Sequence, residues 1–350
     1  MDNKIEEKKI RHSNMELLRI VAMSFIMLHH FWCHGMLYKQ FTFPAYEILE
    51  GFSMGGVDLF IMISGFFGIK LSWKSVVGLA LTVAFFFLVN IGVASAIFDN
   101  VNPALRLTEF AKAPLSNSGY WFIATYFILM LVSPVVNRGI RSFTLPQLRA
   151  VILILSAVEF YSMAVIGNRV DIMGTGIFTF IYLYMLGYYL RQETALQKIP
   201  TWVFPVASIV LALISIGIEL AILDTPTLKQ SMRQFFFKQS NPLTIFSKAA
   251  ILCWFTRLTF QSRWVNSLAT AAFGVYLLQD GIGGEYLYNW QRAMFDQLGF
   301  SWSYAALLLG IFIALWLAAW LLTRLKDLWT PWLTDRIVTL IPRSLRQPLQ

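Results

Sequence analysis

The stretch LRIVAMSFIMLHH, residues 18–30, decides the fold of this 350-residue chain. It belongs to an apolar run over residues 15–36 that is long enough to cross the roughly 30 Å hydrocarbon core of a membrane as a helix. Arg19 stands near its start, and His29 and His30 stand at its end. Such side chains are costly within lipid, so each of them needs either an anchoring or a functional explanation.

The composition of the whole chain agrees with a membrane protein. Hydrophobic residues make up 57% of it and charged residues only 13%, which is more apolar surface than a soluble domain of this size buries. Because lipid leaves backbone groups without water partners, we predict an all-α, polytopic bundle. Ten apolar runs are long enough to span, at residues 15–36, 52–69, 75–98, 119–137, 147–166, 172–190, 201–222, 242–256, 264–283 and 302–323.

The distribution of cations sets the predicted topology. The net charge of +9 would suit a nucleic-acid partner, but the cations lie in short segments between apolar runs, so no nucleic acid is expected. If the chain starts inside, 18 of the 28 Lys and Arg residues lie in cytoplasmic segments and eight in outer ones. Both termini are therefore predicted to be cytoplasmic. Outer loops are predicted over residues 37–50, 99–118, 224–240 and 284–301.

This topology divides the chain into three parts. We predict a charged cytoplasmic arm over residues 1–14, a transmembrane domain over 15–326 and a cytoplasmic amphipathic tail over 327–350. The tail mixes Trp, Leu and Arg, a composition typical of a helix that lies on the inner membrane surface.

The spacing of Arg19 and His30 predicts a shared helical face. Eleven residues are about 20° more than three turns, so the two side chains face the same way, roughly 16 Å apart along the axis. Snorkelling of Arg19 to the headgroups is a serious alternative, and an interfacial position is favoured for His29. The shared face favours a functional pair, because a neutral imidazole can accept a proton near neutral pH. Glu16, one turn before Arg19, is expected to pair with it.

Several stretches, taken in order, resemble acyltransferase family 3 of bacterial membrane proteins. They are the Arg19–His30 spacing, GGVDLFIMISGFF (55–67), GYWFIATYFILMLVSPVVN (119–137), FIYLYMLGYYLR (180–191), NPLTIFSKAAILCWF (241–255) and FGVYLLQD (273–280). The resemblance implies O-acyl transfer, most simply O-acetyl transfer from acetyl-CoA, to an extracytoplasmic glycan or glycolipid at the bacterial cell membrane. It also implies that His30 is the catalytic base and Arg19 its partner on the donor side. Acyl-CoA is then a substrate, and we expect no permanently bound cofactor and no metal site.

Polar residues on other predicted helices lie at about the depth of His30. The topology places Asp58, Trp121, Tyr276, Gln279 and Asp280 in the outer part of the membrane, which predicts an acceptor pocket that opens outward. Four of them also have an ordinary explanation. Asp58 could form a hydrogen bond between helices, and Asp280 could mark the end of its helix. Trp121 and Tyr276 could belong to an interfacial belt of aromatic residues. Relatives often carry histidine at position 279, so a second acid–base role there is in doubt.

Donor binding is assigned to Arg19, Lys70, Lys74, Ser64 and Tyr126. The two lysines could bind the CoA phosphates, although positive-inside anchoring explains them equally well. They stand where many relatives have an arginine cluster. The small residues around Ser64 favour close helix packing, but would also admit a pantetheine arm.

Two other classes of function remain open. A transporter or flippase for a glycan or lipid-linked sugar would also have many spans and buried polar groups. Transporters commonly show internal repeats around a midplane site, whereas this chain shows no repeat and its polar residues are displaced outward. A structural partner in glycan synthesis would leave Arg19, His30 and Asp58 unexplained. For Tyr286, Tyr288 and Trp290, an interfacial belt is favoured over stacking on sugars.

Overall fold

The computed structural model describes residues 12–36, 44–97, 120–164, 174–223, 241–280, 282–342, 344 and 346. Every regular element within these residues is a helix. The longer helices are α1 (Ser13–Cys33), α4 (Trp73–Ile97), α6 (Trp121–Ser142), α7 (Leu145–Ala164), α9 (Val203–Leu223) and α15 (Trp302–Asp327). The shorter ones are α2 (Pro44–Ser53), α3 (Gly56–Phe67), α8 (Ile177–Gln192), η3 (Thr194–Lys198), α11 (Pro242–Phe255), α12 (Arg263–Ala269), α13 (Ala272–Gln279), α14 (Ile282–Leu298) and α16 (Thr330–Leu340).

The described helices confirm an all-α membrane bundle. Seven segments are long and apolar enough to cross a membrane, namely α1, α2 with α3, α4, α6, α7, α9 and α15. Three other predicted spans form shorter elements: α8 and α11 have 16 and 14 residues, and residues 264–283 are divided between helices. The predicted count of ten and the cytoplasmic side of the termini stay predictions.

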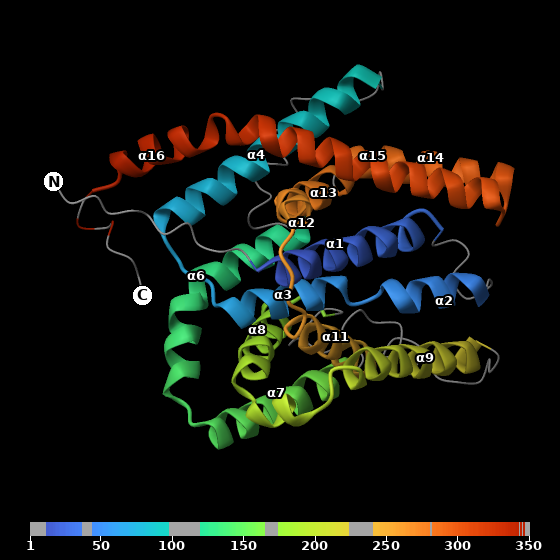
Figure 1. Ribbon diagram of the computed structural model, residues 1–350. Helices are drawn as coiled ribbons and strands as arrows, with labels where there is room; N and C mark the ends of the chain where they lie inside the picture. The colour runs from blue at the N-terminus through green and yellow to red at the C-terminus, as the bar shows by residue number, and fades with distance from the viewer. Residues whose placement is uncertain are drawn as a thin grey trace.

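Helices α1 and α3 lie in the middle of the molecule, with α9 on one side and α15 on the other (Figure 1). The backbones of α3 and α8 touch at two glycines. A Cβ on Gly65 would overlap the carbonyl oxygen of Tyr184, and a Cβ on Gly187 would overlap that of Met62. Close helix packing at Gly65 is therefore confirmed, and this face of α3 offers no slot for a pantetheine arm.

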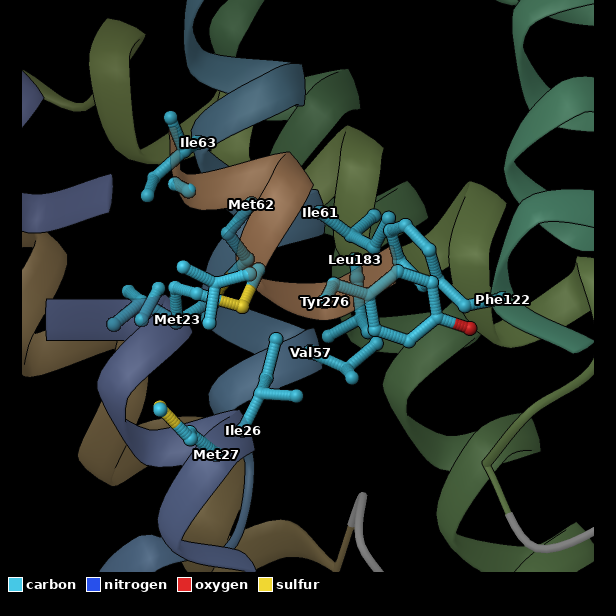
Figure 2. Close-up of a cluster of buried hydrophobic side chains, with 14 of the residues drawn as sticks. Met23, Ile26, Met27, Val57, Ile61, Met62, Ile63, Phe122, Leu183 and Tyr276 are labelled. Atoms are coloured by element: carbon cyan, nitrogen blue, oxygen red, sulfur yellow. The ribbon is translucent and has the colours of Figure 1, made fainter. Parts of the chain in front are cut away.

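An apolar cluster joins the central helices to α6 and α13. Figure 2 shows Met23 and Ile26 of α1 beside Val57 of α3, with Phe122 close to Tyr276. The rings of Phe122 and Tyr276 meet edge to face, with centroids 5.4 Å apart. This cluster fixes α6 and α13 against the C-terminal half of α1, where His30 lies.

Two predicted outer loops contain helices. Residues 37–50 include the start of α2, and residues 284–301 are mostly α14. The predicted loops over 99–118 and 224–240 lie entirely outside the described residues, as do residues 1–11 of the arm. The predicted span over 264–283 is broken after Ala269, where the hydroxyl of Thr270 donates to the carbonyl of Ser267 at 2.7 Å. Such local bonds compete with the helical ladder.

The predicted tail forms helix α16, which packs against α4. Lys74 Nζ of α4 lies 2.6 Å from Asp335 Oδ1 of α16. At the same end of the bundle, Arg149 makes two hydrogen bonds to Glu193, at 2.6 and 2.7 Å. These bonds lower the pKa of Glu193 to about 2, so this carboxylate stays charged in mild acid.

Candidate functional site

Helix α1 carries both residues of the predicted pair without interruption. Arg19 Nη1 lies 2.6 Å from Glu16 Oε1, so the expected pairing is confirmed. Its guanidinium lies 5.5 Å from the centre of the Phe67 ring, at the end of α3. Arg19 is therefore held between two helices while about a third of its side chain stays exposed.

His30 lies at the other end of α1 and faces a small cavity. Its side chain is buried, and its Nδ1 atom has no hydrogen-bond partner among the described residues. A neutral imidazole with an unoccupied nitrogen is suited to accept a proton from a ligand. The cavity is lined by Met23, Ile26, His30, Val57, Phe60, Trp121, Phe122, Phe273 and Tyr276.

The two histidines beside His30 have different surroundings. His29 Nδ1 lies 2.6 Å from Oε1 of Glu50, a buried residue of α2. His34 is exposed, and its ring centre lies 5.1 Å from that of His30. The contact of Glu50 had no sequence signal, because Glu50 falls in a predicted loop. His34 lies within the predicted span 15–36, four residues after His30, a spacing that places the two on one helical face.

Two predicted acceptor residues, Trp121 and Tyr276, line the cavity with His30. Asp280 ends α13 four residues after Tyr276 and is close enough to act on it electrostatically. Gln279 is fully buried, and neither atom of its amide has a hydrogen-bond partner among the described residues. The structure therefore brings three of the predicted acceptor residues close to His30 or to one another, and leaves Gln279 with unused hydrogen-bonding capacity.

Asp58 has a different neighbour. It is 1% exposed and lies close enough to the buried Lys248 for the two to interact electrostatically. Lys248 also donates to the carbonyl of Phe52 at 3.2 Å. A buried acid near a buried cation has a structural reason to be there, and this reason stands beside the predicted acceptor role.

Two of the predicted donor residues, Ser64 and Tyr126, are neighbours. Ser64 Oγ and Tyr126 Oη are 3.4 Å apart, and Arg19 acts electrostatically on Tyr126. The Tyr126 ring stacks on Phe122, with centroids 5.5 Å apart, and Phe122 lines the cavity of His30. Tyr126 is therefore within electrostatic reach of Arg19 and packs on a wall of the cavity that His30 also lines.

A basic pocket lies where the loop after α3 meets the end of α6. It is lined by Ile69, Lys70, Leu71, Pro134, Asn137, Arg138 and Arg141. Asn137 Nδ2 donates to the carbonyl of Ile69 at 2.9 Å, and the Tyr184 hydroxyl accepts from the Ile69 amide at 2.7 Å, so the loop is fixed against α6 and α8. From the sequence, Arg138 and Arg141 were interpreted only as topological anchors. No sequence pattern indicated that they lie beside Lys70.

Lys74 does not line this pocket. Its ammonium pairs with Asp335 instead, and both side chains are mostly exposed. An anion reaching Lys74 would compete with that carboxylate. Across the described residues, no three His, Cys, Asp or Glu side chains are grouped so as to hold a metal ion.

Similarity to a known protein family extends along most of the chain. A family model described as an acyltransferase domain matches residues 12–329, which is most of the chain. No curated protein and no solved structure matches the sequence. The matched residues include α1 to α15 and thus every side chain of the cavity and of the basic pocket.

Proposed function

Because the chain belongs to acyltransferase family 3, we propose that it is a membrane O-acyltransferase that modifies an extracytoplasmic glycan or glycolipid. The donor is cytosolic acyl-CoA, most simply acetyl-CoA. The observation that carries the proposal is the position of His30: it is buried beside a small cavity, its Nδ1 has no hydrogen-bond partner among the described residues, and it lies on the same helix as Arg19.

In the proposed reaction, His30 acts as general base. It removes the proton from an acceptor hydroxyl as that oxygen attacks the carbonyl carbon of the thioester. The new C–O bond forms, the C–S bond breaks, and the imidazolium returns the proton to the sulfur, so that CoA leaves as the thiol. The aromatic walls of the cavity, including Trp121 and Tyr276, exclude water that would otherwise compete with the acceptor.

The basic pocket is the proposed site of the CoA phosphates. Lys70, Arg138 and Arg141 together offer three positive charges, and an arginine can bind a phosphate through two parallel hydrogen bonds. Arg19 would receive the arm between this pocket and the cavity, beside Tyr126 and Ser64. Lys74 contributes only if its pair with Asp335 opens.

The acceptor is proposed to enter from the opposite end of α1. Trp121 and Tyr276 line the cavity beside His30, and Gln279 and Asp280 offer hydrogen-bonding groups to a sugar. Asp58 keeps its proposed acceptor role, with its electrostatic contact to Lys248 as the structural alternative.

Mass spectrometry of surface glycans, in cells with and without the gene, tests the proposed function. We expect loss of ester-linked acetyl groups in cells without the gene, and recovery with the wild-type chain but not with His30→Ala. Unchanged glycans, together with no use of acetyl-CoA by the purified protein, would contradict the proposal.

A further inference from the structure

Three side chains, His30, His34 and Tyr288, form a row whose middle member is exposed. The ring centre of His34 lies 5.1 Å from that of His30 and 5.1 Å from that of Tyr288, a residue of α14. His30 and Tyr288 are buried, whereas His34 is exposed. The row therefore joins the end of α1 to α14 immediately beside the proposed general base.

Two members of this row have unused polar atoms. Neither Nδ1 of His30 nor the hydroxyl of Tyr288 has a hydrogen-bond partner among the described residues, although both atoms are buried. Buried polar groups in folded proteins are almost always satisfied, so exceptions need an explanation. A ligand that brings hydroxyl groups would supply the missing partners.

The row is held in place by the backbone of α1. Arg292 donates from Nε and Nη2 to the carbonyl of His34, at 2.8 and 2.6 Å. Gln291 Nε2 donates to the carbonyl of Phe31 at 2.9 Å. Two consecutive residues of α14 thus attach this helix to the last turn of α1, which fixes Tyr288 relative to His34 before any ligand binds.

The charges near the row favour a neutral ligand. The carboxylate of Asp280 is close enough to act electrostatically on both His34 and Tyr288, and the guanidinium of Arg292 acts on His34 with the opposite sign, so charges of both signs lie beside the row. A carboxylate accepts hydrogen bonds from hydroxyl groups and repels an anion. Together with an imidazole and a phenol, this is the chemistry that recognises a sugar ring with several free hydroxyls.

We propose that His34 and Tyr288 form an acceptor subsite for a neutral glycosyl unit, which presents its reacting hydroxyl to His30. This inference rests on the proposed acyl transfer and names residues that bind the acceptor. Tyr288 donates or accepts a hydrogen bond through its hydroxyl, and the exposed ring of His34 contacts the same sugar on the outer side.

The test uses the full-length protein in sealed vesicles loaded with acetyl-CoA, with a panel of p-nitrophenyl hexosides outside as acceptors. Tyr288→Phe removes one hydroxyl and keeps the ring, so kcat/KM for the hexoside should fall about tenfold, mostly through KM. His34→Ala should act in the same direction. Tyr161→Phe is the matched control, because this tyrosine is 73% exposed on α7.

The possible results distinguish a failure of the proposed subsite from a failure of the proposed acyltransferase function. Unchanged acceptor KM in both variants would overturn the subsite and leave the proposed reaction standing. Hydrolysis of acetyl-CoA by the wild type without transfer to any hexoside would overturn the glycosyl assignment. Failure of the wild type to use acetyl-CoA at all would remove the proposed function itself. His34→Ala keeps the test open if Tyr288→Phe does not fold, because His34 is exposed.

Discussion

His29 Nδ1 lies 2.6 Å from Glu50 Oε1, whereas the Nδ1 atom of the next residue, His30, has neither a carboxylate nor a hydrogen-bond partner among the described residues. Two consecutive histidines therefore have different chemical surroundings. His29 pairs with the carboxylate of Glu50 and thereby links α2 to α1. His30 is free to act on a ligand in its cavity.

This difference predicts different effects of removing each histidine. His30→Ala should lower the rate of acyl transfer on the order of 10²–10⁴-fold, the usual contribution of a general base. His29→Ala should mainly destabilise the protein, because it leaves the buried Glu50 without its partner.

The measurement is transfer activity per folded molecule, with folding followed by size-exclusion chromatography and melting temperature. A double variant, His29→Ala with Glu50→Gln, should recover part of the lost stability. If His29→Ala abolished activity in well-folded protein while His30→Ala did not, the roles of the two residues would be reversed.

The basic pocket predicts a second effect, on the donor. Replacing both Arg138 and Arg141 by Gln should raise the KM for acetyl-CoA by about tenfold or more, because hydrogen bonds to charged groups contribute roughly 1.5–3 kcal/mol each. Arg19→Lys should also raise it, since lysine keeps the charge but loses the planar fork. Arg336→Lys, on α16, is the control. Steady-state kinetics at a fixed acceptor concentration compare the wild type with the three variants. An unchanged KM for acetyl-CoA would mean that these arginines only anchor the topology.

Close contact between α3 and α8 predicts a third effect, on stability. Gly65→Ala places a methyl group where the carbonyl oxygen of Tyr184 lies, so it should destabilise the protein by about 1–3 kcal/mol. Gly78→Ala is the matched control, because nothing lies within 4 Å of a Cβ at that position of α4. Thermal unfolding in detergent compares the two. Equal melting temperatures would show that α3 and α8 are not in backbone contact.

The ion pair of Arg149 and Glu193 predicts a pH dependence of stability. The pKa of Glu193 is about 2 in the folded protein, below the value of about 4.3 for an unperturbed glutamate. The pair therefore stabilises the fold fully above about pH 4.3, and this contribution is lost as the pH falls toward 2. The melting temperature of Glu193→Gln should lie below that of the wild type at pH 7, and the gap should narrow in acid. A gap that does not depend on pH would contradict the assignment to charge.

Part of this architecture was predictable from local sequence. Helix α1 extends from Ser13 to Cys33, as the apolar run predicts. Helix α14 was missed because Tyr, Asn, Gln and Arg lower its hydropathy. Its buried positions Tyr288, Gln291 and Phe295 nevertheless follow the i, i+3, i+7 spacing of an amphipathic helix. Helix α2 was missed because its buried face is acidic, with Glu47 and Glu50.

Residues of the candidate site were predictable only where they share one helix or where the topology places them at the same depth in the membrane. The spacing of Arg19 and His30, and the shared depth of Trp121 and Tyr276, follow from helix geometry and topology. The pocket of Arg138 and Arg141 depends on how the end of α6 packs on the loop after α3, a long-range contact with no local sequence pattern.

The central claim is that one site takes its donor from the cytoplasm and its acceptor from outside. Moving the phosphates of acyl-CoA into lipid costs much free energy. The proposed donor pocket lies toward the end of α1 that carries Arg19, and Arg19 is roughly 16 Å from His30 along the helix axis. Sealed vesicles in the native orientation, loaded with acetyl-CoA and given an acceptor outside, should therefore make acetylated product. The same vesicles with both substrates outside should make none. Product only when both substrates are outside would show that the site opens to one face, and would contradict the account.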